Sequence, residues 1–293
     1  MTAATDAPAW FTRALAEPVQ TGRFDVDGVG INYRAWGRPG QHGIICVHGG
    51  AAHARWWDHI APQFCRQRRV VAIDLSGHGD SDRRDRYTMQ AWVDELLATA
   101  PATGITGRPV VLAHSMGGFV TLIAAVQAGA RFEGIMTIDS PVREPTPEEM
   151  AFQGQRAFGP LKVYPSREAV IARFRPVPEQ QTVLPYVGAH VAETSVRPYQ
   201  GGWAWKFDPR IFGHARLSLA ALTRLDCRVA LFRAEHGLVT EEISDDMFDR
   251  LGRVAPTVEI PDAGHAVMLD QPLALVTAVR TLLADWEHSV VVG

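Results

Sequence analysis

Short apolar runs alternate along the chain with longer stretches in which apolar residues recur every three or four positions. The short runs, such as IICV and VVLA, are apolar throughout, a pattern typical of strands buried on both faces of a sheet. They predict eight strands, at residues 23–26, 31–36, 43–47, 70–73, 109–113, 134–138, 228–233 and 257–260. The longer stretches predict helices at residues 87–100, 116–129, 241–251 and 272–287.

This alternation predicts an α/β fold, a mainly parallel sheet with helices on both faces. The first two strands are close in sequence and should pair as an antiparallel hairpin at one edge. Residues 141–217 interrupt the alternation, since they show no clean strand and hold 10 of the 19 prolines and 10 aromatic residues. A structureless connection of that length is unusual. We therefore expect a helical cap inserted into a core domain formed by residues 1–140 and 218–293.

The composition is that of a folded protein and argues against several kinds of partner. The 293 residues are 46% hydrophobic, and 29 Lys and Arg face 32 Asp and Glu, whereas a nucleic-acid-binding surface normally carries a basic excess. Cys46, Cys65 and Cys227 are scattered, which suits a reducing compartment better than a disulfide framework. The N-terminus lacks a signal-peptide pattern, and the most apolar segment, 109–130, is interrupted by polar residues and glycines. We expect a cytoplasmic protein that neither spans a membrane nor binds nucleic acid.

The segment PVVLAHSMGG, residues 109–118, gives the strongest indication of chemistry. A predicted strand turns there directly into a predicted helix, which forces Ser115 into a tight turn at the helix N-terminus, where N–H groups favour an anion. The small residues Ala113 and Gly117 let strand and helix approach closely. With these features the chain resembles the α/β-hydrolase fold enzymes over nearly its whole length, Ala113 standing at the first glycine of their G-x-S-x-G motif. The resemblance implies an eight-stranded, mostly parallel sheet, a nucleophilic Ser115 and no cofactor.

The segment IICVHGGAA, residues 44–52, resembles the loop of that family which forms part of the oxyanion hole. The resemblance implies that the N–H groups of Gly50 and Met116 hold the negative charge of a tetrahedral intermediate. His48 would then orient the loop. Histidines 48, 53 and 59 are close in sequence but lack ligand partners at metal-site spacing, so we expect no metal.

The candidates for the base and its acid all follow Ser115 in the chain. His265 stands between the last predicted strand and the final helix, where the resemblance implies the catalytic base. The family's acid commonly follows the next-to-last strand, where this chain has Gly237. Asp139 and Glu235 are the two alternatives, because Asp139 ends the strand beside that of Ser115 and Glu235 lies two residues before Gly237. We favour Asp139, a position used by some lactonases and esterases of the family, although an Asp at a strand end also commonly caps a turn.

The expected cap covers the sheet edge where open α/β sheets bind their ligands, and it is rich in aromatic residues. Its candidates for lining an apolar substrate pocket are Phe158, Tyr186, Trp203 and Trp205. For any one of these side chains, packing of the cap onto the core is the more ordinary role.

Together these features predict a serine hydrolase that cleaves a carboxylic ester or lactone of a small, mainly apolar molecule through an acyl-enzyme on Ser115. One alternative is a carbon–carbon bond hydrolase of ring-cleavage products, which uses the same triad. Another is a small-molecule receptor with slow or absent turnover, which Gly237 keeps open because a lost acid can mean a lost activity. The expected partner is a small-molecule substrate, and a homodimer is the oligomer left open.

Overall fold

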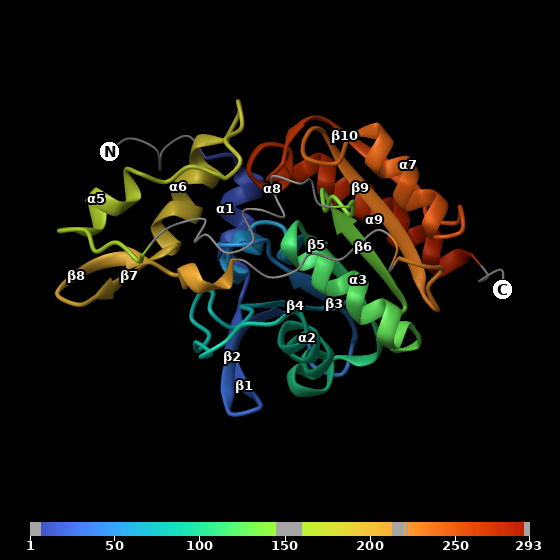
Figure 1. Cartoon of the computed structure of the whole chain (residues 1–293), viewed down its shortest axis with the longest axis horizontal. Helices are drawn as coiled ribbons and strands as arrows, with labels where there is room; N and C mark the ends of the chain where they lie inside the picture. Colours follow the sequence, from blue (N-terminus) through green and yellow to red (C-terminus); the bar gives the residue numbers. More distant parts are fainter. Residues whose placement is uncertain (1–6, 145–159, 213–219, 221, 290–293) are drawn as a thin grey trace.

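A twisted eight-stranded sheet forms the centre of the computed structural model, which describes residues 7–144, 160–212, 220 and 222–289 (Figure 1). Its strand order is β1-β2-β4-β3-β5-β6-β9-β10. Strand β2 runs antiparallel to β1 and β4, and the other neighbouring pairs are parallel. The predicted fold class and the edge hairpin are confirmed. The strands are β1 (Gln20–Val26), β2 (Val29–Trp36), β3 (His42–Val47), β4 (Arg69–Ile73), β5 (Thr106–His114), β6 (Gly134–Ile138), β9 (Arg228–His236) and β10 (Thr257–Gly264).

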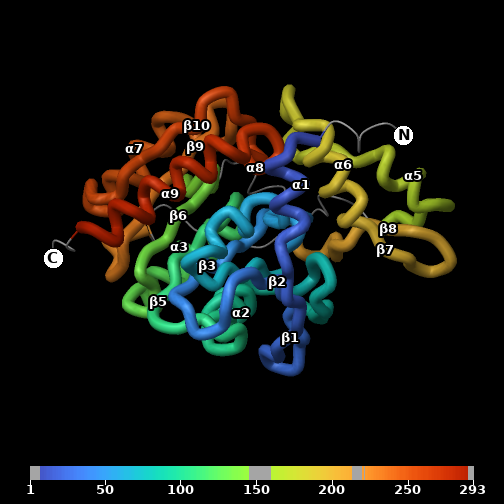
Figure 2. Tube along the Cα trace, turned by 180° about the vertical axis from the view of Figure 1, so that it is seen from behind, coloured from blue at the N-terminus to red at the C-terminus, as the bar shows by residue number. Residues whose placement is uncertain are grey.

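Helices cover both faces of the sheet. Figure 1 shows α2 (Met89–Thr103) and α3 (Met116–Ala128) in front of it, and Figure 2, seen from behind, shows α1 (Ala9–Ala16) and α9 (Pro272–His288). The remaining helices of the core are α7 (Glu241–Arg250), α8 (Val267–Asp270) and the short 3-10 turns η1 (Ala54–Trp57), η2 (Ala61–Phe64) and η3 (Gly129–Arg131). The four predicted helices are present with ends shifted by a few residues. Among the described residues, no helix is both long and apolar enough to cross a bilayer.

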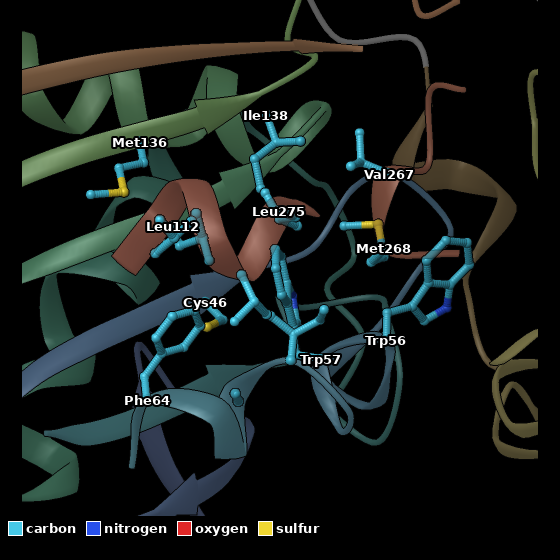
Figure 3. Close-up of a cluster of buried hydrophobic side chains, with 14 of the residues drawn as sticks. Cys46, Trp56, Trp57, Phe64, Leu112, Met136, Ile138, Val267, Met268 and Leu275 are labelled. Carbon is cyan, nitrogen blue, oxygen red and sulfur yellow. The ribbon is translucent and has the colours of Figure 1, made fainter. Parts of the chain in front are cut away.

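Each central strand contributes to two separate hydrophobic cores. In β3, Ile44 and Cys46 pack into the core that contains α1 and α9, whereas Ile45 and Val47 pack into the core beneath α2 and α3. Successive side chains of a strand point to opposite faces, so continuous apolar runs are what a sheet covered on both sides requires. Figure 3 shows the first of these cores, where Leu112 of β5 lies near Cys46. Burying one aliphatic side chain such as Leu112 contributes about 1.5–3 kcal/mol to the stability of the fold. Packing on both faces therefore holds the ends of the central strands in fixed positions.

The chain between β6 and β9 includes elements that lie beyond the sheet, at the left of Figure 1. They are α5 (Arg167–Ile171), α6 (Pro185–Thr194), β7 (Val196–Tyr199), β8 (Gly202–Trp205) and the 3-10 turn η4 (Pro209–Ile211). Strands β7 and β8 form an antiparallel hairpin, so the expectation of no strand in this segment was wrong. The two loop residues Gln200 and Gly201 both have positive φ, 46° and 79°, as a tight hairpin turn requires.

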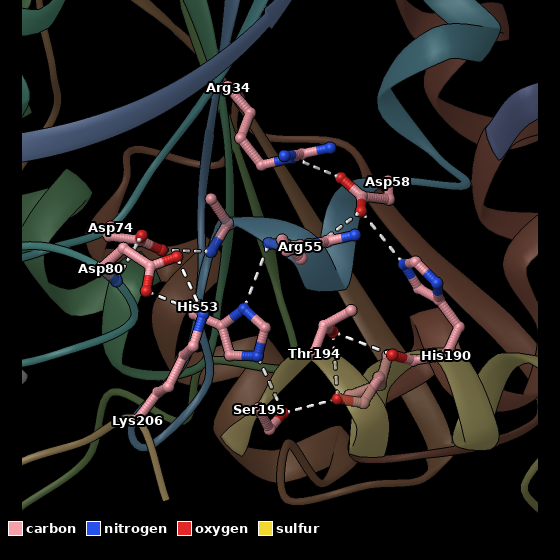
Figure 4. Close-up of polar contacts among 12 residues, drawn as sticks. Arg34, His53, Arg55, Asp58, Asp74, Asp80, His190, Thr194, Ser195 and Lys206 are labelled. Carbon is pink, nitrogen blue, oxygen red and sulfur yellow. Dashed lines mark hydrogen bonds and ion pairs between the residues drawn. The ribbon is translucent and has the colours of Figure 1, made fainter. Parts of the chain in front are cut away.

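A buried ionic cluster joins α6 to the core. Asp58, which follows η1, accepts hydrogen bonds from Arg34 Nε at 2.7 Å and from His190 Nε2 of α6 at 3.0 Å (Figure 4). Burial raises the pKa of Asp58, but His190 and the arginines Arg34 and Arg55 lower it by more. The pKa of Asp58 therefore lies below its usual value. The cluster therefore holds a charged carboxylate between the core and the β6–β9 segment.

Candidate active site

Ser115 occupies a strained turn between β5 and α3. Its φ of 52° and ψ of −118° are unusual for a residue with a side chain, and its N–H donates to Ile138 O of β6 at 2.9 Å. A Cβ at Gly117 would lie 2.5 Å from His48 O, so only glycine lets the start of α3 approach the end of β3 this closely. The Ser115 hydroxyl is thus fixed at the N-terminus of α3, as the sequence predicts.

Three side chains distant in sequence form one hydrogen-bonded series. His265, directly after β10, has Nε2 at 3.0 Å from Ser115 Oγ, 150 positions away, and Nδ1 at 2.6 Å from Asp139 Oδ2, 126 positions away. An ionised carboxylate can only accept, so the proton of the neutral imidazole lies on Nδ1 and the lone pair of Nε2 faces the Ser115 hydroxyl. In this tautomer the imidazole can accept the hydroxyl proton.

Asp139 is fully buried and is held by the chain that follows β9. Its Oδ2 accepts from Leu238 N–H at 2.7 Å and its Oδ1 from Val239 N–H at 3.0 Å, in addition to the bond with His265. Burial alone raises the pKa of this carboxyl, but the hydrogen bonds from His265 and the two N–H groups outweigh it and hold the pKa below its usual value. The carboxylate is therefore ionised and aimed at Nδ1 of His265.

Gly237 explains why a carboxylate from β6 fits here. A Cβ built at Gly237 would lie 2.4 Å from both carboxylate oxygens of Asp139. A side chain at 237 and the carboxylate of residue 139 thus compete for one space. Of the two alternatives for the acid, Asp139 contacts His265, whereas the exposed Glu235 accepts a hydrogen bond from Asp262 N–H at 2.8 Å.

The two N–H groups expected to stabilise an oxyanion lie beside this series. Met116 begins α3, so its N–H has no partner within the helix. A Cβ at Gly50 would lie 3.8 Å from Met116 Sδ, which places the two residues next to each other. Within the described part of the chain, no hydrogen bond uses the N–H of either residue. His48 secures the loop, since its Nε2 accepts from Leu75 N–H at 3.1 Å and burial lowers its pKa to about 4, which keeps it neutral.

Comparison with known proteins agrees with this geometry. The sequence profile of the Alpha/beta hydrolase family matches residues 44–279. The chain belongs to this family. The esterase Rv0045c of Mycobacterium tuberculosis is 26% identical to this hydrolase over 267 residues, which cover 86% of each chain. The pimeloyl-acyl-carrier-protein methyl ester esterase of Aliivibrio fischeri is 23% identical over 251 residues, or 82% of this chain and 93% of that one.

Solved structures show the same fold. The structure of E-2-(acetamidomethylene)succinate hydrolase matches this α/β-hydrolase with a TM-score of 0.78 at 19% identity, covering 91% of this chain and 100% of that one. The thioesterase domain from the curacin biosynthetic pathway matches with a TM-score of 0.75 at 19% identity, over 90% of this chain and 100% of that domain.

The α/β-hydrolase contains a second serine–histidine contact, between Ser195 and His53 (Figure 4). His53 Nδ1 accepts from Arg55 N–H at 3.3 Å, so the ring proton lies on Nε2 and is donated to Ser195 Oγ at 2.8 Å. The Ser195 hydroxyl in turn donates to Val191 O at 2.6 Å. Burial and the nearby cation of Lys206 lower the pKa of His53 well below its usual value. With no free lone pair facing Ser195, this pair is structural.

One group of side chains in the described part of the hydrolase has metal-ligand types close together. Glu235, His236 and Asp262 have ligand atoms within 4.8 Å of one another. Of the three, the sequence indicates only Glu235, and as a candidate acid rather than a metal ligand. All three are exposed. Exposed carboxylates of this kind are common without an ion, so we assign no metal. The histidines 48, 53 and 59 do not form such a group among the described residues.

The aromatic residues expected in a substrate pocket have varied surroundings. The ring of Tyr186 on α6 lies 4.9 Å from that of Phe11 on α1, which is a packing contact between helices, and the ring of Trp205 lies 6.3 Å from that of Phe174. Trp203 pairs through its backbone with Tyr164, and Phe158 lies outside the described residues. A cavity of about 260 Å³ near η4 is lined by Arg83, Pro160, Leu161, Asp208, Pro209 and Arg210. None of the four predicted aromatic residues lines it, so their role in a substrate pocket stays a prediction.

Three side chains that the sequence did not indicate hold the backbone around His265. His114 bonds to His265 O at 2.8 Å and Gln180 to Ala266 N–H at 3.0 Å. Asp270 bonds to Gly264 N–H at 2.6 Å. Asp270 is near His265 in sequence, so its contact was open to prediction. Gln180 lies 86 positions from its partner, and no local pattern indicates it.

Proposed function

We propose that this α/β-hydrolase is a serine hydrolase that cleaves a carboxylic ester or lactone of a small, mainly apolar molecule through an acyl-enzyme on Ser115. The observation that carries the proposal is the series of hydrogen bonds from Ser115 Oγ through His265 to Asp139. It is supported by two relatives named as esterases, one of them a methyl ester esterase.

In the proposed first step, Ser115 Oγ attacks the carbonyl carbon of the ester while His265 Nε2 takes the hydroxyl proton. The carbonyl oxygen becomes an oxyanion that accepts hydrogen bonds from the N–H groups of Gly50 and Met116. Each such donor contributes about 3 kcal/mol to lowering the barrier. The imidazolium formed on His265 is stabilised by the buried, ionised Asp139.

Collapse of this intermediate breaks the bond to the alcohol oxygen, which takes the proton from His265 Nε2 and leaves as an alcohol. The acyl group remains on Ser115 Oγ. A water molecule then attacks the acyl carbon while His265 Nε2 takes one of its protons and passes it to Ser115 Oγ as the acid departs. An ester yields an acid and an alcohol, and a lactone yields one hydroxy acid.

The proposal includes residues 141–217 as a cap on the core domain of residues 1–140 and 218–293. Phe212 of this segment supports a site beneath the cap, because a Cβ at Gly50 would lie 3.2 Å from its ring. An aromatic ring against the oxyanion loop favours an apolar acyl or alcohol group.

The test is turnover of a series of p-nitrophenyl esters of increasing acyl length by wild type, Ser115→Ala, Asp139→Asn and Glu235→Gln. We expect no turnover by Ser115→Ala, a loss of at least about 100-fold in Asp139→Asn, and wild-type turnover in Glu235→Gln. A fluorophosphonate should label wild type and not Ser115→Ala. Folded wild type that neither labels nor cleaves any ester would refute the proposal.

A further inference from the structure

The backbone on either side of His265 is held by three different parts of the chain. Asp270 Oδ2 of α8 accepts from Gly264 N–H at 2.6 Å, and His114 Nε2 at the end of β5 donates to His265 O at 2.8 Å. Gln180 Oε1 accepts from Ala266 N–H at 3.0 Å. Two of these contacts come from the core, and the third comes from the segment between β6 and β9.

Gln180 is matched to its surroundings at both ends of its amide. While Oε1 accepts from Ala266, Nε2 donates to Asp270 Oδ2 at 2.8 Å and to Thr182 O at 3.0 Å. If the amide of Gln180 were flipped, its NH2 group would face the N–H of Ala266 and its oxygen would face the oxygens of Asp270 and Thr182. Neither contact is a hydrogen bond, so the amide has one orientation. A Cβ at Gly264 would lie 2.7 Å from Gln180 Cβ, which shows how closely the two backbones pack.

The stretch that carries Gln180 is fastened to the core just beside His265. Leu184 N–H donates to Leu269 O of α8 at 2.9 Å. Val183 and Leu184 pack against the core that includes Met268. Any displacement of this stretch would therefore be transmitted to Ala266 through the amide of Gln180.

We infer that Gln180 is a positioning residue through which the β6–β9 segment holds His265 in line with Ser115. The inference rests on the proposed function. Gln180 bonds to Asp270 and to the backbone N–H next to His265. It would therefore affect the position of the His265 imidazole, and so the proton transfer, rather than substrate binding. A misplacement of about 1 Å in a reacting group costs on the order of 100-fold in rate, and the Nε2–Oγ distance here is 3.0 Å.

Asp270 offers a way to test this with charge. Its carboxyl is buried, burial raises its pKa to about 6, and His236 at the end of β9 acts on it electrostatically. In Gln180→Glu, a protonated carboxyl reproduces the amide, because its O–H donates to Asp270 and its carbonyl oxygen accepts from Ala266 N–H. Once that proton is lost, two carboxylates face each other and the link to the His265 loop is broken.

The experiment measures kcat and KM on one p-nitrophenyl ester from pH 5 to 9 for wild type, Gln180→Ala and Gln180→Glu. Gln127→Glu, an exposed position on α3, controls for the added charge. We expect Gln180→Ala to lower kcat about 10- to 100-fold at every pH with KM within about threefold. The kcat of Gln180→Glu relative to wild type should fall at least about tenfold between pH 5.5 and 8, while that of Gln127→Glu stays flat.

Wild-type kcat in both Gln180 variants, or a change confined to KM, would overturn the inference while leaving the proposed hydrolase intact. A wild type that neither turns over nor labels with fluorophosphonate would instead refute the proposed function. If Gln180→Ala fails to fold, Gln180→Glu decides the matter alone, since its activity at low pH reports a folded enzyme and its loss at high pH reports the broken link.

Discussion

Replacing Gly237 by alanine should displace Asp139, the proposed acid, while leaving that residue itself unchanged. The added Cβ would lie 2.4 Å from both carboxylate oxygens of Asp139, whereas ordinary contacts begin at 3.4 Å, so the carboxylate must retreat by about 1 Å. That movement pulls it from Leu238 N–H, Val239 N–H and His265 Nδ1, which it contacts at 2.7, 3.0 and 2.6 Å. Gly237 does not have a positive φ, so alanine brings no backbone strain and the effect is steric.

Overpacking of this kind costs about 1–3 kcal/mol of stability. Loss of a triad's acid costs up to about 10⁴-fold in turnover, so we expect Gly237→Ala to lower kcat between about 100- and 10⁴-fold with little change in KM. Ester hydrolysis and urea unfolding of the same preparations measure both quantities.

A double-mutant cycle provides the control for this prediction. In an Asp139→Ala background the space beside residue 237 is already vacant, so adding Gly237→Ala should change kcat by less than about threefold. The reasoning is refuted if Gly237→Ala alone turns over like wild type, or if its loss is undiminished in the Asp139→Ala background.

Three further predictions concern Asp139 and the second serine–histidine contact, that of Ser195 with His53. Asp139→Gly combined with Gly237→Asp should turn over at least about tenfold faster than Asp139→Gly alone, because it returns a carboxylate to the shared space; ester hydrolysis measures this. Ser195→Ala should keep kcat within about threefold of wild type and lower the free energy of unfolding by about 1 kcal/mol, because its hydroxyl serves a structural bond; kinetics and urea unfolding check both. The folded-state pKa of Asp139 lies below its usual value of 3.8, so its stabilising contribution is present above that value and is lost as pH falls through the folded pKa. The stability difference between wild type and Asp139→Asn should therefore shrink as urea unfolding is repeated from pH 6 down to pH 3.

Local patterns were enough to predict the sheet, because buried strands such as IICV and VVLA leave continuous apolar runs in the sequence. The hairpin of β7 and β8 escaped prediction because its four-residue strands carry Arg197 and Pro198 in β7 and Gly202 in β8, and neither strand shows a clear alternation of apolar and polar residues. The choice between Asp139 and Glu235 required the structure. Asp139 directly follows β6 and Glu235 lies near the end of the neighbouring strand β9, so only the directions of their side chains distinguish them. Gln180 could not be found at all, because the contact it makes spans 86 positions.

The carboxylate of Asp139 comes from β6 but is surrounded by the chain that leaves β9, and the two strands are neighbours in the sheet. The space beside the His265 imidazole can thus be occupied by a carboxylate at position 139, after β6, or by a side chain at position 237, after β9. A lineage that moves its acid from one strand to the other must pass through a chain with two carboxylates in that volume or with none. Either intermediate is expected to be a poor enzyme. Descent by single substitutions should therefore preserve whichever strand first supplied the acid, so that its position records ancestry within the family.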